Sequence, residues 1–145
     1  MKKLIVLLGP TGVGKTALSI ELAQRYGCPI ISSDSRQIYK GIEIGTAAPT
    51  QEEQSLVKHY FVGIKELTED YSAGQYEIDA LNLINELFKT HDTLLLTGGS
   101  MMYIDAVCNG IQQVGFTHTG RAIKEQRIID LAGNVGNRDG GAVGE

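Results

Sequence analysis

A glycine-rich loop at residues 9–16 carries the most specific chemistry in this sequence. It reads Gly-Pro-Thr-Gly-Val-Gly-Lys-Thr and fills every fixed position of the pattern G-x-x-x-x-G-K-[ST]. Backbone amides in such a loop surround phosphate oxygens, and glycine permits this because no Cβ obstructs the approach. We expect Lys15 to neutralise the terminal phosphates and Thr16 to ligate a Mg²⁺ ion that bridges them. The predicted diphosphate-binding residues are Gly9, Pro10, Thr11, Gly12, Val13, Gly14, Lys15 and Thr16.

A polar cluster at residues 33–39 is the second candidate for chemistry. It reads Ser-Asp-Ser-Arg-Gln-Ile-Tyr and directly follows the short strand predicted at residues 29–32. A polar segment after a buried strand lies at the carboxyl edge of an α/β sheet, where such folds bind ligands. Taken alone, Asp34 also fits a helix cap, and Arg36 also fits an ordinary solvated cation.

The elements around these segments indicate how the chain positions them. Residues 3–8 are predicted to be a buried strand because five of them, 4–8, are apolar, and residues 17–23 have a helical pattern. The loop therefore joins a strand to a helix. Loops with a short helix are predicted between residues 40 and 54. Further elements are predicted at residues 59–62 (strand), 76–88 (helix), 93–97 (strand) and 101–107 (helix). This alternation predicts an α/β fold, a doubly wound parallel sheet whose central strand is residues 3–8.

Several large side chains near these segments are expected to pack rather than to react. Tyrosines at the edges of a core usually bury the ring and satisfy the hydroxyl, and methionines fill irregular core space. On this basis the residues predicted to pack are Tyr39, Tyr71, Tyr76, Ile78, Met101, Met102 and Tyr103, together with residues 81–88.

The sequence changes character after residue 111. Residues 112–145 are rich in glycine and polar side chains, and only residues 121–131 keep a helical pattern, through Ile123, Ile128 and Leu131. Residues 134–145 show no periodicity. We therefore predict a core with the phosphate loop at residues 1–111 and a divergent, partly disordered tail at residues 112–145.

Composition sets outer limits on function. The 145 residues are 42% hydrophobic and 21% charged, as in ordinary soluble α/β proteins. A net charge of −4 gives no general attraction to nucleic acid, so any RNA contact must come from a local site. Cys28 and Cys108 form no ligand pattern, which favours free thiols in a reducing cytosol. No stretch is long enough to cross a membrane, so we expect a cytoplasmic protein with no membrane partner.

Five segments in order along the chain resemble the tRNA dimethylallyltransferases, also called tRNA isopentenyl-pyrophosphate transferases. The first two are the phosphate loop and the Asp-Ser-Arg-Gln-Ile-Tyr segment at residues 34–39. The third is Gly-Thr-Ala at residues 45–47 with Pro49. The segment Tyr-Ser-Ala-Gly at residues 71–74 and the segment Gly-Gly-Ser-Met-Met-Tyr at residues 98–103 follow. The resemblance extends from about residue 3 to about residue 111, and the segment at 34–39 is its most specific part.

The resemblance implies an enzyme and a reaction. Family members transfer a dimethylallyl group from dimethylallyl diphosphate to the exocyclic amine of adenosine 37, beside the tRNA anticodon. The phosphate loop is often described as ATP-binding, but here it would hold the prenyl diphosphate with Mg²⁺ as cofactor. Asp34 matches the proton acceptor, and Lys15 and Thr16 complete the implied catalytic set. The residues that match tRNA-contacting positions of the anticodon-arm site are Asp34, Ser35, Arg36, Gln37 and Ser100.

The sequence also departs from the family pattern. Family members continue beyond the segment matching residue 111 into a further half that grips the anticodon arm, whereas residues 112–145 do not follow them. We therefore expect a chain truncated relative to the family, in which diphosphate binding is retained and turnover is in question. Two alternatives stay open from the residues: a small-molecule kinase with the same loop, and a phosphate-binding remnant without catalysis.

Overall fold

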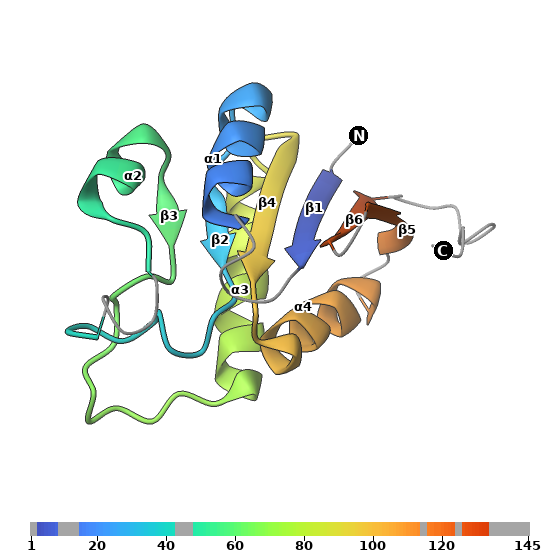
Figure 1. Cartoon of the computed structure of the whole chain (residues 1–145). Helices are drawn as coiled ribbons and strands as arrows, with labels where there is room; N and C mark the ends of the chain where they lie inside the picture. The colour runs from blue at the N-terminus through green and yellow to red at the C-terminus, as the bar shows by residue number, and fades with distance from the viewer. Residues whose placement is uncertain (1–2, 9–14, 43–47, 114–115, 124–125, 134–145) are drawn as a thin grey trace.

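The computed structural model describes residues 3–8, 15–42, 48–113, 116–123 and 126–133. In these ranges the strands are β1 (Lys3–Leu8), β2 (Ile30–Ser32), β3 (His59–Tyr60), β4 (Thr93–Gly98), β5 (Phe116–Ile123) and β6 (Gln126–Gly133). The helices are α1 (Lys15–Tyr26), α2 (Gln51–Leu56), α3 (Ala73–Leu87) and α4 (Met101–Gln113). The strands form one sheet in the order β3-β2-β4-β1-β6-β5 (Figure 1).

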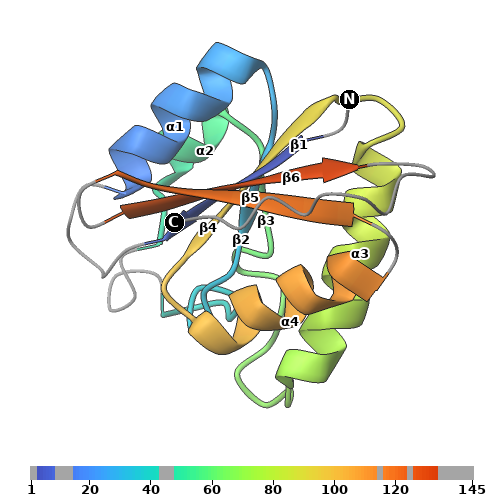
Figure 2. The ribbon, with the colours of Figure 1, turned by 90° about the vertical axis from the view of Figure 1, so that its right-hand side faces the viewer.

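The predicted doubly wound sheet is confirmed, with β1 in its interior. Strands β3, β2, β4 and β1 run parallel, and β1 pairs with β4 from Lys3 opposite Thr93 to Leu8 opposite Gly98. Helices α1 and α2 lie on one face of the sheet, and α3 and α4 lie on the other (Figure 2). The apolar core accordingly divides into two clusters. One lies between the sheet and α1, and the larger one lies between the sheet and the pair α3 and α4.

The helix predicted at residues 121–131 is wrong, because the described residues of this segment, 121–123 and 126–131, belong to the strands β5 and β6. Strand β6 runs antiparallel to β1 and pairs with the whole length of β1, from Ala132 opposite Lys3 to Arg127 opposite Leu8. Strand β5 pairs in turn with β6 (Figure 2). Strand β1 would otherwise present unpaired backbone groups on this side, and pairing satisfies them. Adjacent β-branched residues such as Ile128 and Ile129 also suit a strand. Residues 134–145 lie outside the described ranges.

Helix α3 shows how its sequence sets its buried face. The side chain of Ser72 caps it by accepting a hydrogen bond of 3.1 Å from the amide of Gln75. Its buried residues are Tyr76, Ala80, Ile84 and Leu87, spaced three and four apart. Ile78, predicted to be buried, is 56% exposed, because two residues of helix rotate its side chain to the opposite side from Tyr76.

The described residues include no helix long and apolar enough to span a membrane. Their two cysteines, Cys28 and Cys108, are free thiols, and burial raises the pKa of each to about 11.

These thiols should therefore react slowly with a thiolate-specific reagent. The pKa of each rises from 9.0 to about 11, and each unit lowers the reactive thiolate fraction about tenfold at pH 8. We expect the folded protein to react with an aromatic disulfide reagent about 100-fold more slowly than the same chain unfolded in urea. Equal rates in the two states would contradict the burial of both thiols.

Candidate functional site at the carboxyl edge of the sheet

Helix α1 is the next described element after the central strand, in the order that the phosphate-loop motif requires. Lys15 and Thr16 are the first residues of α1, and β1 ends at Leu8. The hydroxyl of Ser19 donates a hydrogen bond of 2.8 Å to the carbonyl of Thr16, which orders the first turn. Thr16 itself is half-buried. The predicted binding residues between them, 9–14, lie outside the described residues.

Asp34 begins a tight turn directly after β2. Its Oδ1 accepts hydrogen bonds from the amides of Arg36, at 2.9 Å, and Gln37, at 3.3 Å. Asp34 is half-buried, and Ser35 and Arg36 are exposed. The carboxylate therefore caps a turn, whereas the sequence had suggested that it could cap a helix. Both of these hydrogen bonds end on Oδ1, and neither uses Oδ2.

Ser100 lies against this turn, although 65 residues separate it from Ser35 in sequence. The Oγ of Ser100 accepts a hydrogen bond of 2.8 Å from the amide of Ser35 and donates one of 3.1 Å to the Oγ of Ser35. The amide of Ser100 donates to the carbonyl of Ser33 at 3.3 Å. The ends of the neighbouring strands β2 and β4 thus bring together two segments that the sequence singled out separately.

Gln37 joins the turn to the segment after β3. The hydroxyl of Ser32 donates to its Oε1 at 3.3 Å, and its carbonyl accepts from the amide of Gly63 at 2.9 Å. The next residues continue this pairing, because the carbonyl of Ile38 accepts from the amide of Ile64 at 2.8 Å. The turn that carries the residues expected to contact RNA is therefore hydrogen-bonded to Ser100 on one side and to Gly63 on the other.

Three tyrosines, Tyr71, Tyr76 and Tyr103, pack against one another next to the Asp34 turn. The Tyr76 hydroxyl donates a hydrogen bond of 2.9 Å to the carbonyl of Ser32, two residues before Asp34. Its ring stacks on that of Tyr103 with centroids 4.2 Å apart, and the Tyr103 hydroxyl donates to the carbonyl of Tyr71 at 3.3 Å. Burial raises the pKa of Tyr76, so the phenol stays protonated and able to donate. Packing roles for Tyr71 and Tyr103 were expected, but no pattern in the sequence indicated the link from Tyr76 to Ser32.

The expected core role of two methionines is wrong. Met101 is 53% exposed and Met102 is 70% exposed. They open α4, whose buried side begins with Tyr103 and Ile104, so they lie on the far side of its first turn.

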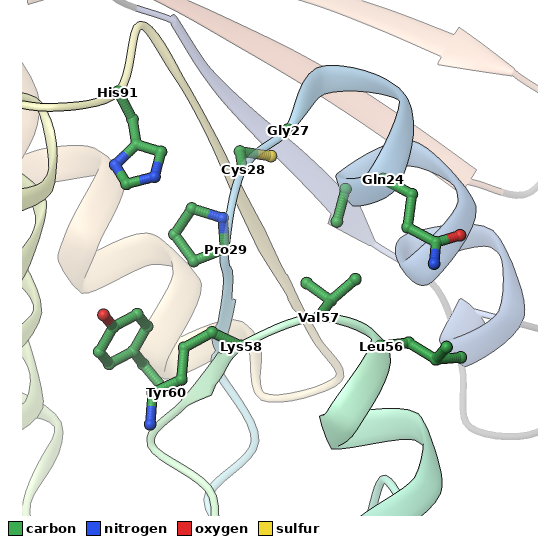
Figure 3. Close-up of a pocket in the computed structure, with 10 residues that line it drawn as sticks. Gln24, Gly27, Cys28, Pro29, Leu56, Val57, Lys58, Tyr60 and His91 are labelled. Carbon is green, nitrogen blue, oxygen red and sulfur yellow. The ribbon is translucent and has the colours of Figure 1, made fainter.

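A pocket of about 310 Å³ lies at the opposite edge of the sheet (Figure 3). Its lining includes Pro29, Lys58 and His91, which precede β2, β3 and β4, respectively. Asp34 and Ser100, in contrast, follow β2 and β4. The Lys58 ammonium lies 5.3 Å from the centroid of the Tyr60 ring, so it is engaged within the pocket wall. Ligands in parallel α/β sheets bind at the carboxyl edge, so this pocket is not the candidate site.

A family model described as IPP transferase matches residues 37–136, which is more than half of the chain. The chain belongs to the IPP transferase family. The match continues past residue 111, where the resemblance read from the sequence ends.

Curated relatives of this chain are named tRNA dimethylallyltransferase. The chain is 60% identical over 114 residues to tRNA dimethylallyltransferase 2 of Parabacteroides distasonis, covering 79% of the chain and 38% of that protein. It is 57% identical over 113 residues to tRNA dimethylallyltransferase 1 of Bacteroides fragilis, covering 78% and 38%, respectively. The chain therefore spans little more than a third of the length of these relatives.

Solved structures agree with this assignment. The full-length tRNA isopentenylpyrophosphate transferase of Bacillus halodurans matches with a TM-score of 0.71 and 40% sequence identity, over 78% of this chain and 36% of that one. A eukaryotic dimethylallyltransferase described as acting on tRNA matches with a TM-score of 0.67 and 32% identity, over 71% of this chain and 25% of that one. Over the matched part of the chain, the fold described above is thus the fold of the corresponding part of these enzymes.

Proposed function

We propose that this chain transfers a dimethylallyl group from dimethylallyl diphosphate to the exocyclic amine of adenosine 37 in tRNA. The observation that carries the proposal is the hydrogen-bonded pairing of the Asp34 turn with Ser100, at the edge of the sheet where α1 begins. Relatives named tRNA dimethylallyltransferase at 57–60% identity support it. We place this chemistry in residues 1–111, with residues 112–145 as a divergent tail, in a cytoplasmic protein.

The first half of the reaction is departure of the diphosphate. As the allylic C–O bond breaks, its electron pair and the developing negative charge pass to the diphosphate. The ammonium of Lys15, the loop amides and the positive end of α1 would stabilise that charge. Interactions that strengthen as charge develops accelerate the reaction itself, rather than only tightening substrate binding.

The residues present fit a Mg²⁺ ion shared with the diphosphate. Mg²⁺ prefers oxygen ligands and is usually held by one or two protein groups together with phosphates and water. Thr16 offers a hydroxyl oxygen at the start of α1. The described residues contain no group of three or more His, Cys, Asp or Glu side chains that could hold a metal ion. When bound, the ion would supply further charge neutralisation on the leaving group.

The second half of the reaction is attack by the adenine amine. Its lone pair is delocalised into the ring, so the new C–N bond forms readily only if a base takes the amine proton. We assign this role to Asp34, whose Oδ2 is not used by the turn hydrogen bonds. A positioned general base of this kind contributes roughly 10²–10⁴-fold to the rate.

The adenosine must leave its stack to reach this carboxylate. Extrusion of a base costs a few kcal/mol, which contacts to the flanking nucleotides can offset. Ser35 and Arg36 are exposed beside Asp34, and Ser100 is hydrogen-bonded to Ser35. We propose that these side chains, with Gln37, hold the anticodon arm around the extruded base.

A comparison of ligands tests the proposal against ATP-dependent chemistry. With Mg²⁺ present, we expect dimethylallyl diphosphate to raise the unfolding temperature, because a ligand that binds only the folded state stabilises it. ATP at the same concentration should give a smaller shift. A larger shift with ATP would favour a kinase and contradict the proposed substrate. No shift with either ligand would contradict a diphosphate site.

A further inference from the structure

The last residue of β4 approaches Ser33, the residue after β2, more closely than any side chain would allow. Gly98 is buried, and a Cβ built on it would lie 2.5 Å from the carbonyl oxygen of Ser33 and 2.5 Å from its Oγ. The carbonyl carbon of Ser33 would be 2.6 Å away. Two of these three atoms are backbone, so no change of rotamer relieves the contact. Glycine is therefore required here for proximity between strands.

This close approach lies between the two segments of the candidate site. Ser33 immediately precedes Asp34, and Gly98 lies two residues before Ser100. The hydrogen bonds from the Ser100 amide to the Ser33 carbonyl, at 3.3 Å, and from the Ser35 amide to the Ser100 Oγ, at 2.8 Å, both span the same gap. Among the residues that the structure describes, the Oγ of Ser33 has no hydrogen-bond partner, so no hydrogen bond within this part of the chain holds the gap through that side chain.

We propose that Gly98 is a positioning residue that sets the spacing between the Asp34 turn and Ser100. Its missing Cβ lets the ends of β2 and β4 close until Ser100 reaches the Ser35 amide. Added bulk at this position would push the Ser33 backbone away, and Asp34 would move with it. The catalytic consequence rests on the proposed function, in which Asp34 takes the amine proton and Ser100 contacts the RNA.

Gly110 in α4 provides a matched control. A Cβ on Gly110 would lie 2.6 Å from the Leu81 Cδ1 and 2.9 Å from the Glu77 Oε1, so it is comparably crowded. Those atoms are the ends of flexible side chains, which can rotate away. The same glycine-to-alanine change therefore displaces side chains at Gly110 and backbone at Gly98.

Amide hydrogen exchange on the 145-residue chain tests the spacing without any need for activity. We expect Gly98→Ala to speed exchange of the Ser35 amide at least ~10-fold, because its acceptor moves out of reach. Gly110→Ala should leave this amide protected as in the wild type. The amides of β1 report whether each variant is folded. A folded Gly98→Ala protein with normal protection at Ser35 would overturn the proposal.

A double variant covers the case in which Gly98→Ala does not fold. Ser33→Ala combined with Gly98→Ala removes the Oγ contact but keeps the carbonyl contact. We expect it to fold and to show the same loss of protection at Ser35, because the backbone contact remains. Normal protection at Ser35, or failure of this variant also to fold while Gly110→Ala folds, would mean that Gly98 serves global packing and would overturn the proposal.

Prenyl transfer to an anticodon stem-loop then gives the catalytic consequence. We expect Gly98→Ala to lower kcat about 10-fold or more, with KM for dimethylallyl diphosphate unchanged, because the displaced groups lie on the RNA side of the site. If the Ser35 amide loses its protection in Gly98→Ala but kcat is unchanged, the claim that this spacing matters for catalysis is overturned. Absence of transfer by the wild type would instead count against the proposed function, and the exchange result would still decide the spacing.

Discussion

Replacing Asp34 by asparagine should lower the rate of prenyl transfer by roughly 10²–10⁴-fold while leaving diphosphate binding unchanged. The asparagine amide cannot take a proton at neutral pH. Its carbonyl oxygen can still accept the two hydrogen bonds that Asp34 accepts from the amides of Arg36 and Gln37. The turn should therefore keep its shape, and the loss should appear in the chemical step.

The measurement combines single-turnover transfer with diphosphate binding. Because the chain spans 38% of the Parabacteroides relative, the assay should also use a chimera in which residues 1–111 replace the matching part of that protein. Glu69→Gln is a suitable matched control, since it makes the same chemical change at an exposed carboxylate in another loop. If Asp34→Asn transfers at the wild-type rate, Asp34 only caps the turn and the assignment as base is wrong.

Replacing Lys15 by alanine should remove most of the stabilisation that the diphosphate gives. A ligand present at about 100 times its Kd adds about 2.7 kcal/mol to folding stability. Lys15 begins α1 directly after the phosphate loop, and loss of its positive charge should weaken binding enough to abolish most of the thermal shift. The measurement is the unfolding temperature with and without dimethylallyl diphosphate and Mg²⁺.

Lys89→Ala is the control for this prediction. Lys89 is exposed and pairs with Glu86 at 2.9 Å, in the connection between α3 and β4 at the amino edge of the sheet. Its removal lowers the net charge equally but should leave the ligand-dependent shift unchanged. Equal shifts in the wild type and in Lys15→Ala would show that Lys15 is not a phosphate ligand.

The order of elements up to α4 follows from local patterns in the sequence. Apolar runs such as residues 3–8 and 93–97 are long enough to indicate buried strands, and the helices between them have clear apolar faces. The carboxyl-edge rule then placed the polar segment at residues 33–39 on the ligand-binding side before any contact was known. These features depend on a few neighbouring residues, which is why they could be predicted.

The pairing of Ser35 with Ser100 could not be predicted from the residues. It depends on how closely β2 and β4 approach at Gly98, a distance set by backbone atoms of segments about 65 residues apart. The hydrogen bond from Tyr76 to Ser32 is of the same kind. A sequence pattern marks the face on which a side chain lies, but it gives no information on which distant backbone group its polar end meets.

The prediction of a helix at residues 121–131 was wrong for a different reason. Its apolar residues suggested a helix, but Ile128 and Leu131 lie opposite Leu7 and Leu4 of β1, at the other end of the chain. Ile123 lies in β5 and pairs with β6. Pairing with an existing strand edge outweighed the weak local preference for helix. The prediction that Met101 and Met102 are buried was wrong because it rested on residue type alone, whereas the buried side of α4 begins at Tyr103.

Transfer of labelled dimethylallyl from its diphosphate to an anticodon stem-loop tests the central claim most directly. The assay uses the chain and the chimera with the Parabacteroides relative, and that relative serves as the positive control. Our account predicts a prenylated adenosine at position 37 with the chimera, and none when that adenosine is replaced by guanosine. A folded chimera that binds the RNA but forms no prenylated adenosine, beside an active relative, would contradict it.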